Sequence, residues 1–119
     1  MKISFDFDGT LSRESVQKYA KELIDRGFDC IVTTFRQKEH IPPDSNNDLL
    51  EVAKNIGISE IRFTEGQDKS FFLEDVFLHL DDEYNCLREV QRNSKCIPIS
   101  IWGNWQGKIE RIIRRKGIH

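Results

Sequence analysis

The sequence has no long apolar run, few prolines and almost no excess charge of either sign. No stretch of its 119 residues approaches the roughly 18 consecutive apolar residues that span a bilayer. Asp6 and Asp8 fall where the apolar segment of a secretion signal would lie. Only 3 prolines and no low-complexity segment argue against disorder. A net charge of −2 differs from the strong positive charge typical of proteins that bind nucleic acids over their whole surface.

Cysteine is also scarce. The three cysteines, Cys30, Cys86 and Cys96, are an odd number and show no Cys-x-x-Cys spacing, so we expect reduced thiols. A chain of this length can form one hydrophobic core without disulfides or metals to stabilise it. We therefore expect a soluble cytoplasmic protein with a single domain over residues 1–119 and no membrane partner.

Apolar periodicity alternates between strand and helix along the chain. Strands are predicted over residues 2–8, 30–35, 60–64, 76–80 and 96–102. Helices are predicted from an N-cap at Ser12 to Gly27, over 49–56, briefly over 69–74, around 86–90 and around 109–113. Pro98 within the last strand predicts a place at the edge of the sheet, because proline cannot donate a backbone hydrogen bond.

This order predicts an α/β fold, namely one doubly wound domain of three layers with a mainly parallel five-stranded sheet and right-handed crossovers. In such sheets ligands bind outside the carboxyl ends of the strands, where the strand order reverses. We therefore look for functional residues just after the first, second and fourth strands.

The first strand ends in Asp6-Phe7-Asp8-Gly9-Thr10-Leu11. A polar turn with a capping aspartate is one interpretation, but it does not explain acids on an apolar strand, where a charge is costly to bury. The segment resembles the first motif of the haloacid dehalogenase (HAD) superfamily, most of whose members are phosphatases. The resemblance implies a HAD-like Rossmannoid fold without a cap domain.

The three other motifs of that superfamily have candidates in the same order. Thr33 is the better candidate for the second and Thr34 the alternative; Lys69 is favoured over Lys54 for the third. Asp81-Asp82 matches the acidic pair of the fourth. A response-regulator receiver also combines acids, threonine and lysine on this fold, but its acceptor aspartate ends the third strand, where this chain has Phe63-Thr64-Glu65.

The resemblance implies a phosphomonoester hydrolase with Mg²⁺ as cofactor. Asp6 would be the nucleophile that becomes an aspartyl-phosphate, and Asp8 the general acid and base. Lys69 would offset negative charge, and Thr33 would bind phosphate with backbone N–H groups. Gly9, Thr10 and Thr34 are assigned to substrate binding. The metal ligands would be Asp6, the backbone carbonyl of Asp8, and Asp82 in preference to Asp81.

Two departures from the family concern the cover of the site. Residues 10–14 and 66–68 leave no room for the caps usual in the superfamily, so the resemblance implies an open site. Loop 36–48 is the only sizeable insertion, and it is either solvated or brings Arg36, Lys38 and His40 over the site. The substrate class stays open among nucleotides, nucleic-acid ends, phosphoproteins and sugar phosphates, and a partner subunit could cover the site.

A second functional hypothesis is a weakly catalytic or non-catalytic module that binds phosphorylated or nucleic-acid ligands on the same fold. We expect His79 to be a packed core histidine, and Trp102 and Trp105 to close the sheet edge. The basic run Arg111, Arg114, Arg115 and Lys116 is either a solvated helix face or a nucleic-acid contact.

Overall fold

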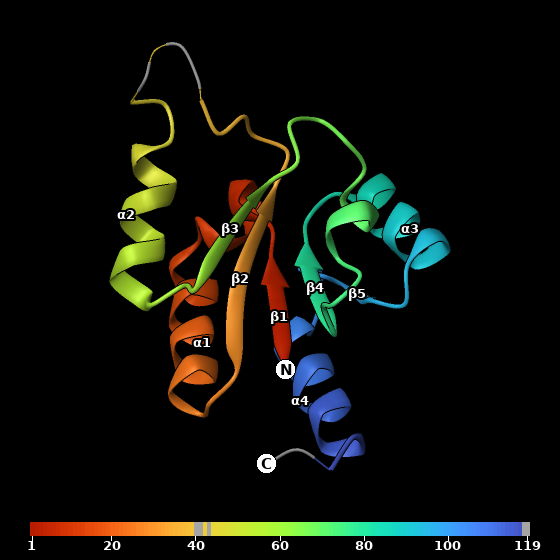
Figure 1. Cartoon of the computed structure of the whole chain (residues 1–119). Coiled ribbons are helices and arrows are strands. Elements are labelled where there is room, and N and C mark those ends of the chain that lie inside the picture. Colours follow the sequence, from red (N-terminus) through yellow and green to blue (C-terminus); the bar gives the residue numbers. More distant parts are fainter. Residues whose placement is uncertain (40–41, 43, 118–119) are drawn as a thin grey trace.

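Strands and helices alternate along the chain in the predicted order. The computed structural model describes residues 1–39, 42 and 44–117 (Figure 1). The strands are β1 (Lys2–Phe5), β2 (Asp29–Thr34), β3 (Glu60–Phe63), β4 (Leu78–Asp81) and β5 (Ile97–Ser100). The helices are α1 (Glu14–Asp25), α2 (Asn47–Ile56), α3 (Tyr84–Asn93) and α4 (Trp105–Arg115), with a turn η1 (Phe7–Leu11) and a short 3-10 helix η2 (Lys69–Phe72).

The five strands form one sheet in the order β3-β2-β1-β4-β5, and every neighbouring pair is parallel. The predicted α/β fold is therefore confirmed, as is the edge position of the strand that contains Pro98. The strand order reverses between β1 and β4, so their carboxyl ends flank the switch point, at the top of Figure 1.

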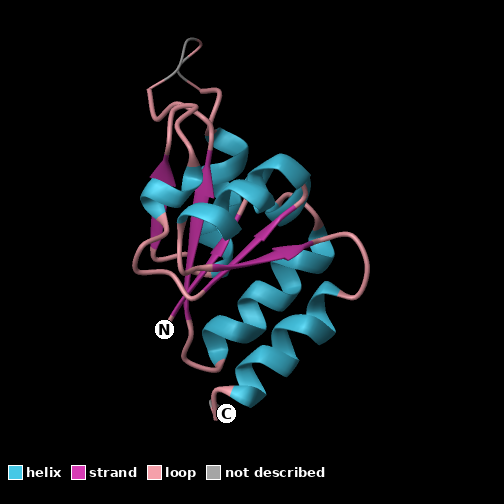
Figure 2. Cartoon of the chain, turned by 90° about the vertical axis from the view of Figure 1, so that its right-hand side faces the viewer, coloured by secondary structure: helices cyan, strands magenta, loops and turns pink. Residues whose placement is uncertain are grey.

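Helices cover both faces of the sheet, which makes three layers (Figure 2). One face carries the larger core, where side chains of α1, α2 and α4 pack on Ile3, Phe5 and Val32. The other face carries a smaller core that includes Ile31, Leu73 and Val90. Strand residues alternate between the two cores, so Ser4 and Asp6 share the face on which α3 and η2 lie.

Several predicted boundaries were wrong by a few residues. β1 ends at Phe5 rather than at residue 8, because the chain turns through Gly9, which has φ of 76°. Ser12 does not cap α1, which begins after Arg13; the Ser12 hydroxyl instead accepts a hydrogen bond from the Gly9 N–H inside the turn. β4 begins at Leu78, and β5 is confined to 97–100.

The two tryptophans behave differently. Trp105, predicted to close the sheet edge, is half-buried and packs edge-on against Tyr19 of α1 in the larger core. Trp102 does not close the sheet edge: 62% of its side-chain surface is exposed, because it lies in the connection after β5 rather than in the strand.

The three cysteines are all buried and unpaired, in agreement with the prediction of free thiols. The run Arg111, Arg114, Arg115 and Lys116 is exposed on α4. Among the described helices, none combines the length and apolar character needed to cross a bilayer.

Candidate active site

Three carboxylates meet at the carboxyl end of the sheet. Asp6 directly follows β1, Asp81 is the last residue of β4, and Asp82 follows it. Since β1 and β4 are parallel neighbours, their carboxyl ends lie together, and the three side chains offer oxygens within 4.8 Å of one another. Asp6 and Asp81 are buried and Asp82 is half-buried. This is the cluster that the sequence predicts.

Lys69 joins two of these acids. Its Nζ lies 2.8 Å from Asp6 Oδ1 and 2.8 Å from Asp81 Oδ2, and its side chain is almost fully buried. Burial by itself would lower the pKa of Lys69, but the charges of Asp81 and Asp6 outweigh it and raise the pKa. Lys69 therefore remains a cation inside the site. Lys54, the alternative, lies on the exposed surface of α2.

The ionisation of Asp6 depends on nearby positive charge. Burial raises its pKa most and the neighbouring Asp81 adds to the rise, while Lys69 opposes it; the resulting pKa is about 7. The Thr10 hydroxyl donates a hydrogen bond of 3.3 Å to Asp6 Oδ2. Thr10, predicted to bind substrate, therefore holds the second oxygen of Asp6, while Lys69 holds the first.

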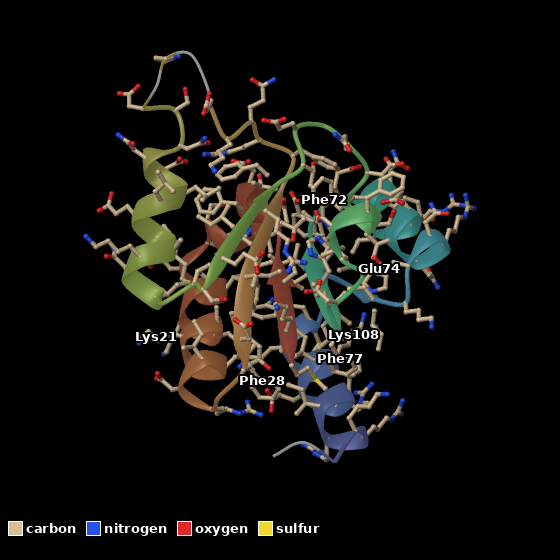
Figure 3. All side chains as sticks on the ribbon, in the orientation of Figure 1. Lys21, Phe28, Phe72, Glu74, Phe77 and Lys108 are labelled. Atoms are coloured by element: carbon tan, nitrogen blue, oxygen red, sulfur yellow. The ribbon has the colours of Figure 1, made fainter. Side chains whose placement is uncertain are left out.

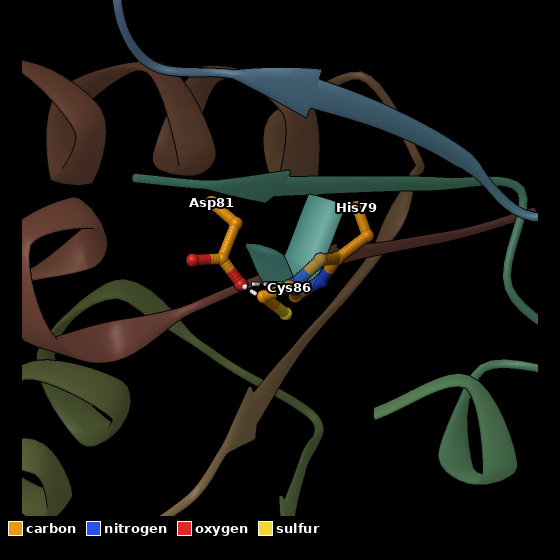
Figure 4. A group of neighbouring side chains, drawn as sticks. All are labelled: His79, Asp81 and Cys86. Carbon is orange, nitrogen blue, oxygen red and sulfur yellow. Dashed lines mark hydrogen bonds and ion pairs between the residues drawn. The ribbon is translucent and has the colours of Figure 1, made fainter. Parts of the chain in front are cut away.

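Asp81 accepts hydrogen bonds from three side chains at one oxygen. Besides Lys69, its Oδ2 is 2.8 Å from His79 Nε2 and 3.2 Å from Cys86 Sγ (Figure 4). Burial favours the neutral acid, but His79 and Lys69 outweigh it and hold the pKa of Asp81 below its usual value. Asp81 is therefore an anion fixed by donors from β4, η2 and α3.

The hydrogen-bond network continues from His79 through Ser4 to Thr33 on β2. His79 Nδ1 lies 2.9 Å from Ser4 Oγ, which lies 2.7 Å from Thr33 Oγ1. Burial lowers the pKa of His79, so its ring is neutral. The ionised Asp81 can only accept, so Nε2 carries the ring proton and Nδ1 accepts from Ser4. Ser4 must then accept from Thr33.

This order of donors bears on the second motif. The Thr33 hydroxyl is fully buried and its proton is committed to Ser4. The Thr34 hydroxyl accepts from the Arg36 N–H at 3.2 Å and keeps its own proton. The role of Thr33 as a phosphate ligand stays a prediction, and in this arrangement Thr34 is the one of the two with a hydroxyl proton to donate.

Gly9 and Asp82 are in close contact. A Cβ built on Gly9 would lie 2.3 Å from Asp82 Oδ2, so a larger residue at this position would force this carboxylate to shift. The positive φ of Gly9 independently favours glycine. The turn after β1 thus places Asp82 against its backbone, which is a structural reason for glycine besides the predicted role in substrate binding.

Asp8 is not one of the three clustered carboxylates. Its oxygens accept from Arg36 Nη2 at 2.7 Å and Nε at 3.0 Å, and the same guanidinium binds both oxygens of Asp48 at 2.7 and 3.0 Å. Arg36 also lies over the ring of Phe7, 5.0 Å from its centroid. The Asp8 side chain is 61% exposed, at the rim of the site.

Loop 36–48 therefore contacts the site through Arg36. The Lys38 side chain is exposed, and His40, the third candidate of the loop, lies outside the described residues. Residues 6–14 and 64–69 connect β1 to α1 and β3 to η2 directly, with no inserted domain in either described segment. The carboxylate cluster therefore has no cap from these two connections.

The sequence analysis missed three site residues, Ser4, Cys86 and Asp48, and it did not predict the hydrogen bonds of His79. One signal in the sequence could have pointed to Ser4 and His79. Ser4 and His79 lie two residues before Asp6 and Asp81 on apolar strands, so each pair shares a strand face. Asp48 and Cys86 lie on helices, and no spacing in the sequence marks them.

The donor set of the cluster fits a hard divalent cation. Asp6, Asp81 and Asp82 offer only oxygen, which is what Mg²⁺ prefers. Asp81 Oδ2 already accepts three hydrogen bonds and its Oδ1 accepts from the Glu83 N–H at 3.2 Å. Asp6 and Asp82 therefore have more free ligand capacity than Asp81, and the preference for Asp82 over Asp81 as a metal ligand stays a prediction.

His79, Asp81 and Cys86 form a second group with metal-type donors, but Lys69 already occupies the same Asp81 oxygen with positive charge.

No family model matches the chain, and no curated protein matches it. We therefore infer function from the geometry of the site together with the motif resemblance.

Proposed function

We propose that the protein is a Mg²⁺-dependent phosphomonoester hydrolase of the HAD type that acts through an aspartyl-phosphate on Asp6. The observation that supports this most is the position of Lys69, a buried cation 2.8 Å from both Asp6 and Asp81 at the switch point of the sheet. A nucleophilic carboxylate held by a fixed cation is the arrangement that attack on an anionic phosphate requires.

The reaction has two steps. In the first, an oxygen of Asp6 attacks phosphorus, the P–O bond to the leaving alcohol breaks, and Asp8 in its acid form gives a proton to that oxygen. In the second, water attacks the phosphorus of the aspartyl-phosphate and gives a proton to Asp8. The bond between phosphorus and the Asp6 oxygen breaks, so that phosphate is released and Asp6 is restored. Lys69 holds Asp6 and balances the negative charge that gathers at phosphorus.

The metal would be held by Asp6 and Asp82, with the backbone carbonyl of Asp8. When bound, Mg²⁺ supplies positive charge that offsets the repulsion among the carboxylates and the phosphate oxygens. The thiols Cys30, Cys86 and Cys96 are buried and unpaired, which supports a reducing compartment, and we place the protein in the cytoplasm.

Hydrolysis of p-nitrophenyl phosphate in the presence of Mg²⁺ tests this proposal. We expect turnover with Mg²⁺, none in excess EDTA, and a hydroxylamine-sensitive labelled phosphoenzyme that is absent from Asp6→Asn. Undiminished turnover in EDTA would contradict the metal assignment. No hydrolysis under any metal condition would overturn the enzyme and favour the binding module on the same fold.

A further inference from the structure

A groove of about 310 Å³ runs along the free edge of the sheet, between α3 and α4. Its floor includes Pro98 on β5, and its walls carry Tyr84 and Arg88 from α3, Trp102 from the connection after β5, and Lys108 from α4. Lys108 is labelled in Figure 3. None of the residues that line it is acidic. In a chain with a net charge of −2, such a groove is locally cationic.

Two aromatic rings are exposed at this groove. Tyr84 is 67% exposed and Trp102 is 62% exposed, among the largest exposures of apolar side chains in the described residues. Each ring has a guanidinium beside its face: Arg88 lies 5.6 Å from the Tyr84 centroid and Arg13 lies 5.2 Å from that of Trp102. Large rings left in water next to cations mark a binding surface rather than an unfinished core.

The cations at the groove are available to a ligand. Within the described part of the chain, Arg13, Arg88 and Lys108 make no ion pair with a carboxylate. Arg36 and Arg62, by contrast, each bind two carboxylates. Charge complementarity therefore favours an anionic occupant.

The groove adjoins the carboxylate cluster. The Trp102 indole N–H donates to the backbone carbonyl of Asp82 at 2.9 Å, and Arg13 Nε donates to the Gly9 carbonyl at 2.7 Å. Gly9 and Asp82 are in contact with each other at the site. A polymer lying in the groove would therefore reach the candidate site with its end.

We propose that this groove binds single-stranded nucleic acid and leads its terminal phosphate monoester to the carboxylate cluster. The delivery of the phosphate to the cluster rests on the proposed function. Bases stack on Tyr84 and Trp102, and Arg88 and Lys108 contact the backbone phosphates. Exposed aromatic rings beside cations in one groove are the arrangement by which proteins hold single strands without reading their sequence.

A peptide added to the sheet edge fits this groove less well. Ile97 and Ile101 donate their N–H groups inward to β4, so positions 98 and 100 face the open edge. Pro98 has no N–H, which leaves Ser100 as the only outward donor of β5. An edge with one donor gives an added strand fewer hydrogen bonds than a regular ladder.

Fluorescence anisotropy of labelled dT₁₀ and rU₁₀ tests the groove, measured in EDTA so that no turnover occurs. We expect Tyr84→Ala to weaken binding by about 5- to 150-fold, the effect of losing one base stack. Lys108→Glu should lower the slope of log affinity against log salt by about 0.7, the value for one phosphate contact on a single strand. Phe71→Ala and Lys54→Glu, at an exposed ring and an exposed cation away from the groove, are the matched controls and should bind as wild type.

The outcomes separate the groove from the active site. Equal binding by wild type, Tyr84→Ala and Lys108→Glu, or tighter binding of a phosphopeptide competitor, overturns the inference. Hydrolysis of p-nitrophenyl phosphate without oligonucleotide binding overturns the groove and leaves the proposed function standing. Oligonucleotide binding that depends on Tyr84, without hydrolysis of any phosphate ester, supports the groove and overturns the proposed function. Release of phosphate from dT₁₀ that carries a terminal phosphate monoester, slower in Tyr84→Ala and with p-nitrophenyl phosphate turnover unchanged, supports both.

Discussion

His79 Nε2 lies 2.8 Å from Asp81 Oδ2, on the same face of β4, and both side chains are buried. This bond links the two ends of the polar network: Thr33 and Ser4 on one side, Lys69 and Asp6 on the other. His79 thus acts on the candidate nucleophile only through Asp81 and Lys69, which makes it a positioning residue.

Replacing His79 should destabilise the fold at neutral pH. His79→Phe removes a buried hydrogen bond to a charged group, and we expect a loss of about 1.5–3 kcal/mol in urea unfolding. His79→Gln can still donate to Asp81 and should recover part of this loss. Equal stability of His79→Phe and wild type would contradict the bond.

The same variant carries a pH signature. Because the pKa of Asp81 is held below its usual value, its stabilising contribution is present above the unfolded pKa, near 3.9, and is lost as pH falls through the folded value. His79→Phe removes part of that contribution. Burial also lowers the pKa of His79, so wild type, unlike His79→Phe, loses stability as pH falls below the unfolded histidine value of 6.5. The stability gap between wild type and His79→Phe should therefore be largest near pH 7, shrink first below about pH 6.5 and shrink again below about pH 4, and only the second decrease reports on Asp81.

Asp8 and Arg36 should matter most for poor leaving groups. General acid assistance is worth about 10²- to 10⁴-fold, so Asp8→Asn should slow alkyl phosphates by that order and p-nitrophenyl phosphate less. Phosphoenzyme should then accumulate on Asp6, since its hydrolysis needs the same group as a base. Arg36→Gln removes the two hydrogen bonds that hold Asp8. We expect this variant also to slow poor leaving groups more than good ones, but by a smaller factor of about 10.

Kinetics over a series of leaving groups measures both effects. The matched control is Arg62→Gln, which removes a guanidinium that also bridges two carboxylates but is not near Asp8. Equal losses for every leaving group in Asp8→Asn, with no trapped phosphoenzyme, would count against Asp8 as the acid.

Gly9→Ala should abolish activity through Asp82. The added Cβ would lie 2.3 Å from Asp82 Oδ2, so the carboxylate must move. Gly66→Ala is the matched control: Gly66 has a similar φ of 82°, but a Cβ there meets nothing within 4 Å. Both variants carry the backbone strain of alanine at positive φ, about 1–2 kcal/mol.

Two measurements then separate strain from contact. When Mg²⁺ is titrated into the p-nitrophenyl phosphate assay, activity should be absent only in Gly9→Ala. Urea unfolding should show a similar loss of stability from backbone strain in both variants. Wild-type Mg²⁺ dependence in Gly9→Ala would show that Asp82 is not where the metal acts.

Local patterns in the sequence were enough for the architecture. Alternating apolar periods gave the order of strands and helices, and Pro98 marked the edge strand because its missing N–H is a local property. The clustering of Asp6, Asp81 and Asp82 also followed, because the carboxyl ends of neighbouring parallel strands must meet. Boundaries were less accurate, since the turn after Phe5 depends on contacts between Gly9, Ser12 and Asp82.

What only the tertiary structure decided is which polar group serves which partner. The sequence places Asp8 two residues from Asp6, yet its carboxylate is held by Arg36, 28 positions away in the chain. It marks Thr33 as a strand-end threonine, yet Ser4 and His79 take up its proton. The sequence does not show where Trp102 lies, and only the structure places its exposed ring beside the site. Side-chain bonding of this kind depends on distances between segments far apart in the chain, and those distances are set only when the sheet and its two cores assemble.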